Sequence, residues 1–167
     1  MNEQTLPDLQ PPRFETGGRH LIAGFGGRFT VDTIAGIPAL WDAFIPHIGK
    51  VPGQVGGVTY GACCNPDGKG GFDYIAGVEV QSLDGLPAEF RTLELLPLRY
   101  AVFRHVGPIA TLHHTVTSIW NKWLPASGME SACAPDFERY SEDYDPVTGE
   151  GLLEIWLPVK ERAGAQH

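Results

Sequence analysis

Two stretches of the chain carry the same pattern of apolar residues, aromatic rings and prolines. Residues 40–46 read LWDAFIP and residues 119–125 read IWNKWLP, so every large apolar, aromatic and proline position matches. Each stretch follows a strand-like segment and precedes two more such segments around a turn-rich connection. Agreement in helix, hairpin and spacing together indicates an internal repeat of one structural unit. The sequence therefore predicts two half-domains, each with the order strand–helix–strand–strand.

The elements of each half follow from hydrophobic periodicity and from turn residues. The first-half strands and helix are expected at residues 20–30, 37–45, 58–64 and 72–80. In the second half, a helix begins at Pro108 and stops at Leu124-Pro125. Its strands are expected at residues 98–106, 135–142 and 152–160. Because each sheet needs a helix over its apolar face, we expect an α+β fold, a tandem β-α-β-β pseudo-repeat with two antiparallel sheets and helices around a central ligand groove.

The chain of 167 residues suits one medium domain or two small, closely packed halves. We expect a flexible N-terminal arm over residues 1–12, which are polar and rich in proline, and a tail over residues 161–167. The domain itself is expected to span residues 13–160, with half-repeats at about 13–85 and 95–160. Since clefts between halves are common ligand sites, we expect a small organic molecule to bind there.

The net charge is −8, from 20 Asp and Glu against 12 Lys and Arg. Such a surface repels phosphate backbones, which disfavours nucleic acid as a partner, and it favours cations. No window approaches eighteen apolar residues and no signal-peptide core is present, so we expect a cytoplasmic protein without membrane contact. The three cysteines fit reduced thiols, and the six histidines lack a metal-binding spacing. We therefore expect neither a cofactor nor a metal site.

The last predicted strand places a carboxylate between apolar neighbours. Alternation puts Glu154 and Trp156 on one face of this strand, and the opposite face is wholly aliphatic. A poorly hydrated carboxylate beside aromatic rings attracts organic cations, and the same desolvation can raise its pKa enough for proton transfer. The alternative is that Glu154 is solvated or pairs with an arginine, while Trp156 packs in the core.

The repeat adds further residues to this candidate site. Aligning the two hairpins sets Tyr74 against Glu154, which places the tyrosine in the same cleft, although a half-buried tyrosine with a hydrated hydroxyl fits the pattern too. Trp41 and Trp120 occupy matching helical positions, where tryptophan more often packs in the core but can offer a ring edge to a ligand. The full set of predicted ligand-binding residues is Glu154, Tyr74, Trp120, Trp156, Trp41, Tyr60, Phe103 and Phe137.

Several longer segments resemble a known family. They read IPALWDAF, TYGACC, FDYIAGVEV, YAVFRHVGPIATLHHTVTSIWNKWLPASG and PDFERYSEDYDPVTGEGLLEIWLPVK. They resemble the GyrI-like or AraC-type effector-binding domains, which include the C-terminal domain of Rob-type activators, the ligand domain of multidrug-sensing regulators and stand-alone gyrase-inhibitor-like proteins. The resemblance covers about residues 13–160 in the family's order, and the closing EIWLPVK is its most specific piece.

This resemblance implies a tandem β-α-β-β fold with a ligand groove between the halves. In multidrug-sensing members the glutamate of the closing strand faces cationic drugs. The matching position here is Glu154, and the tyrosine of the first hairpin matches Tyr74. Only a short arm precedes Arg13, so we expect no helix-turn-helix domain and no direct contact with nucleic acid.

Three functions are compatible with these observations. The leading hypothesis is a stand-alone protein that senses or sequesters a cationic, drug-like or amphipathic small molecule in an acidic aromatic groove. The second is a hydrolase of strained small molecules, because some relatives resemble enzymes that open cyclopropanoid genotoxins with the same glutamate; Glu154 would then be the catalytic residue. The third, a gyrase-inhibitor-like module that binds a protein partner, rests on the resemblance alone.

Overall fold

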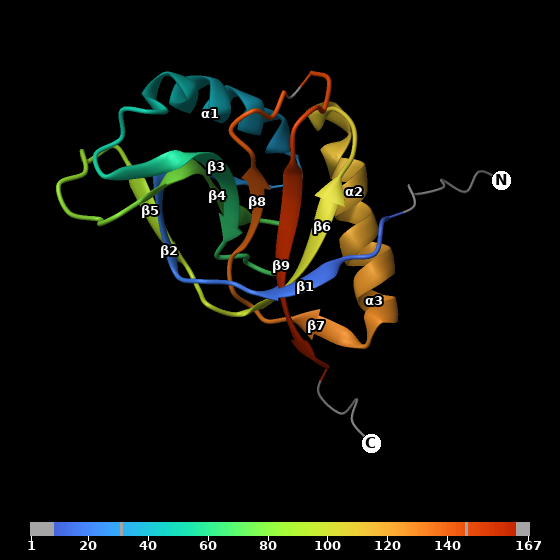
Figure 1. The fold of residues 1–167 in the computed structure, drawn as a ribbon. Coiled ribbons are helices and arrows are strands. Elements are labelled where there is room, and N and C mark those ends of the chain that lie inside the picture. Colours follow the sequence, from blue (N-terminus) through green and yellow to red (C-terminus); the bar gives the residue numbers. More distant parts are fainter. Residues whose placement is uncertain (1–8, 31, 146, 163–167) are drawn as a thin grey trace.

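The computed structural model describes residues 9–30, 32–145 and 147–162 (Figure 1). Within these residues the strands are β1 (Arg13–Thr16), β2 (His20–Phe29), β3 (Gln54–Cys64), β4 (Phe72–Val80), β5 (Arg91–Leu95), β6 (Arg99–His105), β7 (Met129–Ser131), β8 (Asp136–Tyr140) and β9 (Leu153–Glu161). The helices are α1 (Ile37–Phe44), α2 (Leu112–Ser118) and α3 (Leu124–Ser127). The predicted arm and tail fall largely on residues 1–8 and 163–167, which lie outside the described residues.

The fold is α+β, as the sequence predicts, but the strands form one antiparallel sheet rather than two. Their order is β1-β6-β9-β8-β3-β4-β2-β5, with β7 paired to β9. The two halves are joined edge to edge because β3 pairs with β8, from Thr59 opposite Tyr140 to Cys63 opposite Asp136. We call this strand pair the seam. Outward from it, β4 and then β2 follow in the first half, and β9 and then β6 follow in the second.

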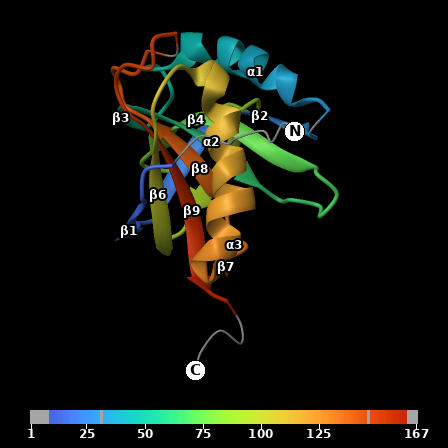
Figure 2. The same cartoon turned by 90° about the vertical axis from the view of Figure 1, so that its right-hand side faces the viewer.

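One face of the sheet carries the helices, and we call it the helix face. Here α1 packs against β2 and β4 around Phe44, and the α2–α3 helix packs against β6 and β9 around Ile119 (Figures 1 and 2). Directly paired residues of antiparallel strands point to the same face, so the register sorts side chains across the whole sheet. The paired residues that cross the seam on the helix face are Ala76, Gly61, Glu138, Ile155 and Phe103.

The opposite face is concave. Its buried cluster contains Ile22 of β2 and Leu95 of β5 together with Tyr100 of β6, although these strands lie at opposite ends of the sheet order. The sheet therefore curls so that side chains from its two ends meet in one cluster. The paired residues that cross the seam on this concave face are Ile75, Ala62, Phe137, Trp156 and Val102.

The second helix continues past the point where the sequence predicts its end. It does not stop at Leu124-Pro125 but passes through a π-helical turn, Ile119–Trp123, into α3 and ends at Gly128 with φ +79°. Pro125 has no N–H to donate, and its ring crowds the carbonyl four residues earlier. A π turn is wider than an α turn and leaves room for this ring. Gly128 then adopts the left-handed conformation that commonly ends helices.

The strands β1, β5 and β7 were not predicted. They contain four, five and three residues. Two of them, β1 and β5, lie at the ends of the sheet order and β7 joins β9 off the main path. Short edge strands are held by the neighbour with which they pair, so their own sequences show little periodicity.

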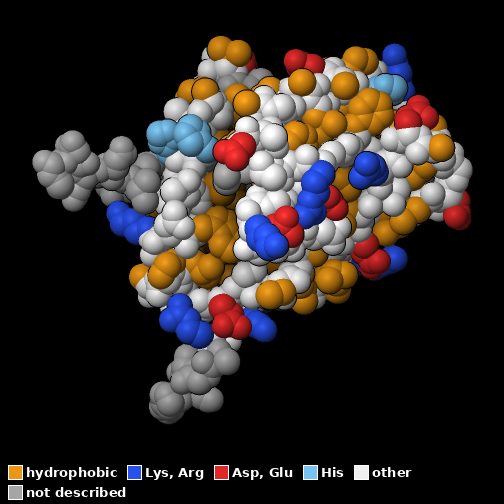
Figure 3. Space-filling model, turned by 180° about the vertical axis from the view of Figure 1, so that it is seen from behind, with side chains coloured by type: hydrophobic (Ala, Val, Ile, Leu, Met, Phe, Trp, Pro, Cys, Tyr) orange, Lys and Arg blue, Asp and Glu red, His pale blue; other side chains and the backbone are white. Residues whose placement is uncertain are grey.

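Hydrophobic side chains at the surface are interspersed with polar ones. Figure 3 shows this on the rear of the molecule, where orange hydrophobic atoms alternate with charged and white ones. The large exposed hydrophobic residues include Ile34, Ile45, Val106, Trp120 and Val147. Single exposed hydrophobic residues are normal in folded domains and need no partner to explain them. In the described part of the chain, no helix combines the length and apolar character needed to cross a membrane.

A close backbone approach between β2 and β4 yields a test of the packing. Gly24 lies opposite Gly77, and a Cβ on Gly24 would stand 1.9 Å from the carbonyl oxygen of Ala76. Because that oxygen belongs to a paired strand, Gly24→Ala is expected to lower the free energy of unfolding by about 1–3 kcal/mol or more. Urea unfolding measures this change. Gly18→Ala is the control, since its Cβ would lie 3.7 Å from His20 Nε2. Equal stability of both variants would contradict the close approach.

Candidate functional site

Glu138 occupies the seam on the helix face, opposite Gly61. Its Oε1 accepts hydrogen bonds from the hydroxyl of Tyr74 at 3.0 Å and from the hydroxyl of Tyr140 at 2.7 Å. The indole Nε1 of Trp41 donates in turn to the Tyr74 hydroxyl at 3.0 Å. Side chains from α1, β4 and β8 thus converge on one carboxylate. We call Glu138, Tyr74, Tyr140 and Trp41 the seam cluster.

Gly61 makes the room that this cluster needs. A Cβ at this position would lie 2.0 Å from the hydroxyl oxygen of Tyr74 and 2.8 Å from Oε1 of Glu138. Above the hydroxyls, the rings of Trp41 and Tyr140 meet edge to face, with centroids 5.4 Å apart. Any side chain at position 61 would displace a hydroxyl from the carboxylate, so the seam cluster requires a glycine there.

The seam cluster holds poorly hydrated negative charge. Burial raises the pKa of Glu138, and hydrogen bonds from Tyr140 and Tyr74 oppose that shift. Burial, followed by the charge of Glu138, raises the pKa of Asp136 to about 7. Among the described residues, Glu138 forms no ion pair with a Lys, Arg or His side chain. Aromatic rings and hydroxyls surround this acid in place of a basic counter-charge.

Glu154 lies on the concave face, in a pocket of about 450 Å³. Its side chain is only 4% exposed, and Oε2 stands 2.8 Å from a guanidinium nitrogen of Arg13. Oε1 accepts a hydrogen bond from Nε1 of Trp156 at 3.1 Å and lies 4.0 Å from Arg139. Unlike Glu138, this carboxylate has guanidinium counter-charges, which is the alternative that the sequence left open. We call this cavity the concave-face pocket.

The walls of the concave-face pocket combine flat rings with paired charges. Phe137 and Trp156 are stacked, with centroids 5.5 Å apart and planes 15° apart. The pocket also contains a hydrogen bond between Nδ1 of His20 and Oε2 of Glu79, at 2.8 Å. Its lining consists of Arg13, Glu15, Thr16, Gly17, Gly18, His20, Tyr60, Glu79, Tyr100, Phe137, Arg139, Leu152, Glu154 and Trp156.

The structure distributes the predicted site residues over both faces of the sheet. Four of them line the concave-face pocket, namely Glu154, Trp156, Tyr60 and Phe137. Tyr74 and Trp41 belong to the seam cluster instead. Phe103 is buried beneath the α2–α3 helix, and Trp120 is 36% exposed in the π turn. Within the described residues, no single cleft gathers all eight.

Tyr74 and Glu154 do not meet, which corrects the predicted alignment of the hairpins. Tyr74 pairs with Cys63 and packs among the α1 residues, whereas Glu154 pairs with Arg139 and lines the concave-face pocket. Side chains of a strand alternate between faces, so an alignment wrong by one residue moves every side chain to the other face. The predicted pairing of Tyr74 with the acid of the last strand contained such a slip.

Sequence reasoning also missed Glu138, Tyr140, Gly61 and Arg13. A signal for two of them existed, because alternation along DFERY puts Glu138 and Tyr140 on one face. The glycine inside the VTYGACC strand was a sign of close approach by a neighbouring group. Arg13 gave no such signal, since it belongs to the unpredicted strand β1.

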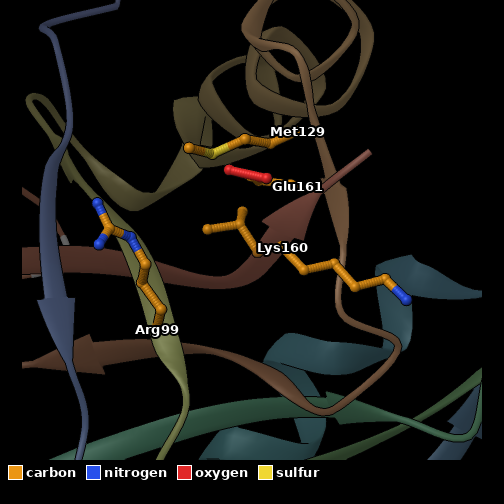
Figure 4. A pocket seen from close by; sticks show the side chains of 5 residues that line it. Arg99, Met129, Lys160 and Glu161 are labelled. Atoms are coloured by element: carbon orange, nitrogen blue, oxygen red, sulfur yellow. The ribbon is translucent and has the colours of Figure 1, made fainter. Parts of the chain in front are cut away.

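A smaller pocket of about 250 Å³ lies where β6, β7 and the end of β9 meet (Figure 4). It is lined by Arg99, Met129, Val159, Lys160 and Glu161. In Figure 4 the ammonium group of Lys160 points away from Met129, and it pairs with Glu130 at 3.5 Å. Arg99 lies over the ring of Phe14 at 4.9 Å. Both basic groups are engaged outside the pocket, so this lining does not support a binding site.

The raised pKa of Asp136 predicts how stability changes with pH. A carboxyl group with a higher pKa in the folded state binds more protons when folded, so stability falls as pH rises from about 4 through about 7. Asp136→Asn removes this loss, and we expect the variant to be more stable than wild type at pH 8 by about 1–3 kcal/mol, with little difference at pH 4. Urea unfolding across this range measures the effect, with the exposed Asp42→Asn as control. A constant difference between Asp136→Asn and wild type at all pH values would contradict it.

The family model of the GyrI-like small molecule binding domain matches residues 11–160. The transcriptional regulator BrlR of Pseudomonas aeruginosa is 28% identical over 154 residues, which cover 90% of this chain and 54% of the relative. The probable transcriptional regulator YgiV of Escherichia coli K12 is 40% identical over 67 residues, covering 40% of this chain and 42% of the relative. The matches thus span about half the length of these curated relatives.

Solved structures share the fold. SAV2435 bound to tetraphenylphosphonium has a TM-score of 0.73 at 18% identity, covering 90% of this chain and 94% of that one. The integron cassette protein VCH_CASS2 from the mobile metagenome of Vibrio cholerae has a TM-score of 0.68 at 23% identity, covering 91% and 97%. The EcmrR C-terminal domain has a TM-score of 0.62 at 12% identity, covering 90% and 97%. Since the family model covers most of the sequence, the chain belongs to the GyrI-like small-molecule-binding domain family.

Proposed function

We propose that this domain binds an organic cation at the seam on the helix face, and that Glu138 provides the negative charge. The observation that carries the proposal is a poorly hydrated carboxylate that lacks a basic partner among the described residues and lies among Tyr74, Tyr140 and Trp41. This is the combination of acid and aromatic rings that the sequence predicts around Glu154, centred instead on Glu138.

The physical basis is an exchange of the groups that contact the Glu138 carboxylate, from hydroxyl donors to a cation. In the present state two hydroxyls donate to the same carboxylate oxygen of Glu138, Oε1. A cation that enters the seam would replace these neutral donors with a full positive charge. A charged hydrogen bond contributes about 1.5–3 kcal/mol. Contact with an aromatic face adds about 0.5–2 kcal/mol. Together these terms favour cations with apolar groups over neutral molecules of the same shape.

Opening the seam requires movement of the groups that now cover Glu138. Trp41 comes from α1 and donates to the Tyr74 hydroxyl, so a displacement of α1 would break this hydrogen bond and allow the Tyr74 hydroxyl to turn away from the carboxylate. We propose that ligand binding and this displacement are coupled. The domain would then report the ligand through the position of α1, in a sensing role, or retain the ligand in a sequestering role.

The comparisons support this proposal at the level of ligand class. SAV2435, whose structure resembles this fold, was solved with tetraphenylphosphonium, an organic cation with four aromatic rings. The curated relatives BrlR and YgiV are named as transcriptional regulators. We therefore propose that ligand binding by this domain serves regulation.

Titration of tetraphenylphosphonium by isothermal calorimetry tests the role of Glu138. We expect Glu138→Gln to weaken binding by at least tenfold, about 1.4 kcal/mol, because the neutral amide keeps the shape but removes the charge. Glu130→Gln is the matched control, since it makes the same change at a residue paired with Lys160 on β9. Neutral triphenylphosphine oxide should bind wild type and Glu138→Gln alike. Equal affinity of wild type and Glu138→Gln for the cation would overturn the proposal.

Hydrolysis of a strained small molecule is a second candidate, and the raised pKa of Glu138 favours it. A carboxyl group with a raised pKa holds its proton over a wider pH range and can transfer that proton to a ring that opens. Mass spectrometry after incubation with a cyclopropane-bearing electrophile should then detect a product with one added water. We expect this product to be absent with Glu138→Gln. Its absence with wild type after prolonged incubation would rule out this activity for the compound tested.

A further inference from the structure

We infer that the concave-face pocket is a second binding site for organic cations, and that Arg13 of the chain itself occupies the cation position in this structure. The class of ligand is a flat aromatic amidine or guanidine, which shares the charge and the planar shape of the arginine head group. This site is separate from the seam cluster, because the strand register sends the two carboxylates to opposite faces of the sheet.

Arg13 makes the contacts that recognition of such a cation requires. Its guanidinium nitrogen lies 2.8 Å from Oε2 of Glu154, and its guanidinium carbon lies 5.9 Å from the ring centre of Trp156. Glu154 is 4% exposed, whereas the side chain of Arg13 is 49% exposed. A charge on the surface therefore reaches inward to a buried acid beside an indole ring. Carboxylate and aromatic face together form the recognition pattern for amidinium and guanidinium groups.

The strand that carries Arg13 is short and lies at an edge of the sheet. β1 has four residues and lies at the end of the strand order, where its pairing partner in the sheet is β6. Arg13 also forms an ion pair with Glu15, whose side chain is 40% exposed. When another cation takes its place, Arg13 can turn to water and remain paired with Glu15. Displacement therefore does not leave the arginine buried without a partner.

The remaining pocket has the shape and charge for a flat cation. Its volume of about 450 Å³ falls within the range of about 300–1,000 Å³ that is usual for ligand sites. The stacked rings of Phe137 and Trp156 offer a flat wall. Without Arg13, the nearest basic group to Glu154 is Arg139, at 4.0 Å from Oε1, and this leaves Oε2 without a cation. An aromatic amidinium can donate to that oxygen while its ring lies along the wall.

Benzamidine is the probe that tests this inference, with affinity measured by isothermal calorimetry. We expect Arg13→Gln to bind benzamidine at least tenfold more tightly than wild type, because the resident guanidinium no longer competes. In Arg13→Gln/Glu154→Gln this gain should be lost. Arg19→Gln is the matched control, since Arg19 pairs with Glu94 and makes no ion pair with Glu154. Neutral benzamide and anionic benzoate should show no gain with Arg13→Gln.

Further variants separate this site from the seam and guard against misfolding. Arg13→Gln/Glu138→Gln should keep the gain for benzamidine, so failure of the seam proposal leaves this test intact. Arg13→Met retains the aliphatic stem without the charge and should behave as Arg13→Gln does, with thermal melting to confirm that each variant folds. The inference is overturned if neither Arg13 variant binds benzamidine more tightly than wild type. A gain that survives Glu154→Gln would overturn it as well.

Discussion

The pairing of β3 with β8 is the interaction on which both candidate sites depend. It joins two small sheets into one and fixes which residues of the two halves lie opposite each other. Glu138 faces the helices because it pairs with Gly61, and Phe137 faces the concave side because it pairs with Ala62. A single step along β8 therefore separates the acid of the seam cluster from a wall of the concave-face pocket.

The carboxylates of Glu154 and Glu138 are compensated in different ways. Glu154 has its charge balanced by guanidinium groups, and Glu138 has its oxygen satisfied by tyrosine hydroxyls. Burying a carboxylate costs free energy unless hydrogen bonds or a counter-charge replace its lost hydration. Hydroxyls replace the lost hydrogen bonds but supply no positive charge. Glu138 therefore still attracts cations, whereas the charge of Glu154 is already balanced by Arg13.

The sequence predicted the main elements because periodicity is a local property. The strand predicted over residues 72–80 is β4 at the same bounds, and the first helix begins at Ile37 as expected. The predictions that were wrong concern properties that depend on the pairing of strands. Whether Glu154 and Tyr74 lie on the same face of the sheet depends on the strand register, and an alignment of the two repeats fixes that register only to within one residue. The position of Arg13 depends on β1, which exists because β6 offers it an edge.

The candidate site residues show the same difference between what local patterns predict and what strand pairing decides. Aromatic residues near an acid were recognisable from the strand patterns. Tyr60, Phe137 and Trp156 line the concave-face pocket with Glu154. Tyr74 joins Glu138 in the seam cluster. The choice between the two acids could not be made from alternation, since each lies on a strand with an aromatic neighbour two residues away. Only the arrangement of counter-charges in three dimensions separates them.

The glycine at position 61 gives the seam an unusual property. The depth of the space under the hydroxyl of Tyr74 is set by the absence of a side chain at this position, because a Cβ here would lie 2.0 Å from that hydroxyl oxygen. A single methyl group would therefore push the Tyr74 hydroxyl away from Glu138 while the carboxylate itself stayed in the sequence. One backbone position thus controls both the size of the seam and the hydrogen bonding of its acid.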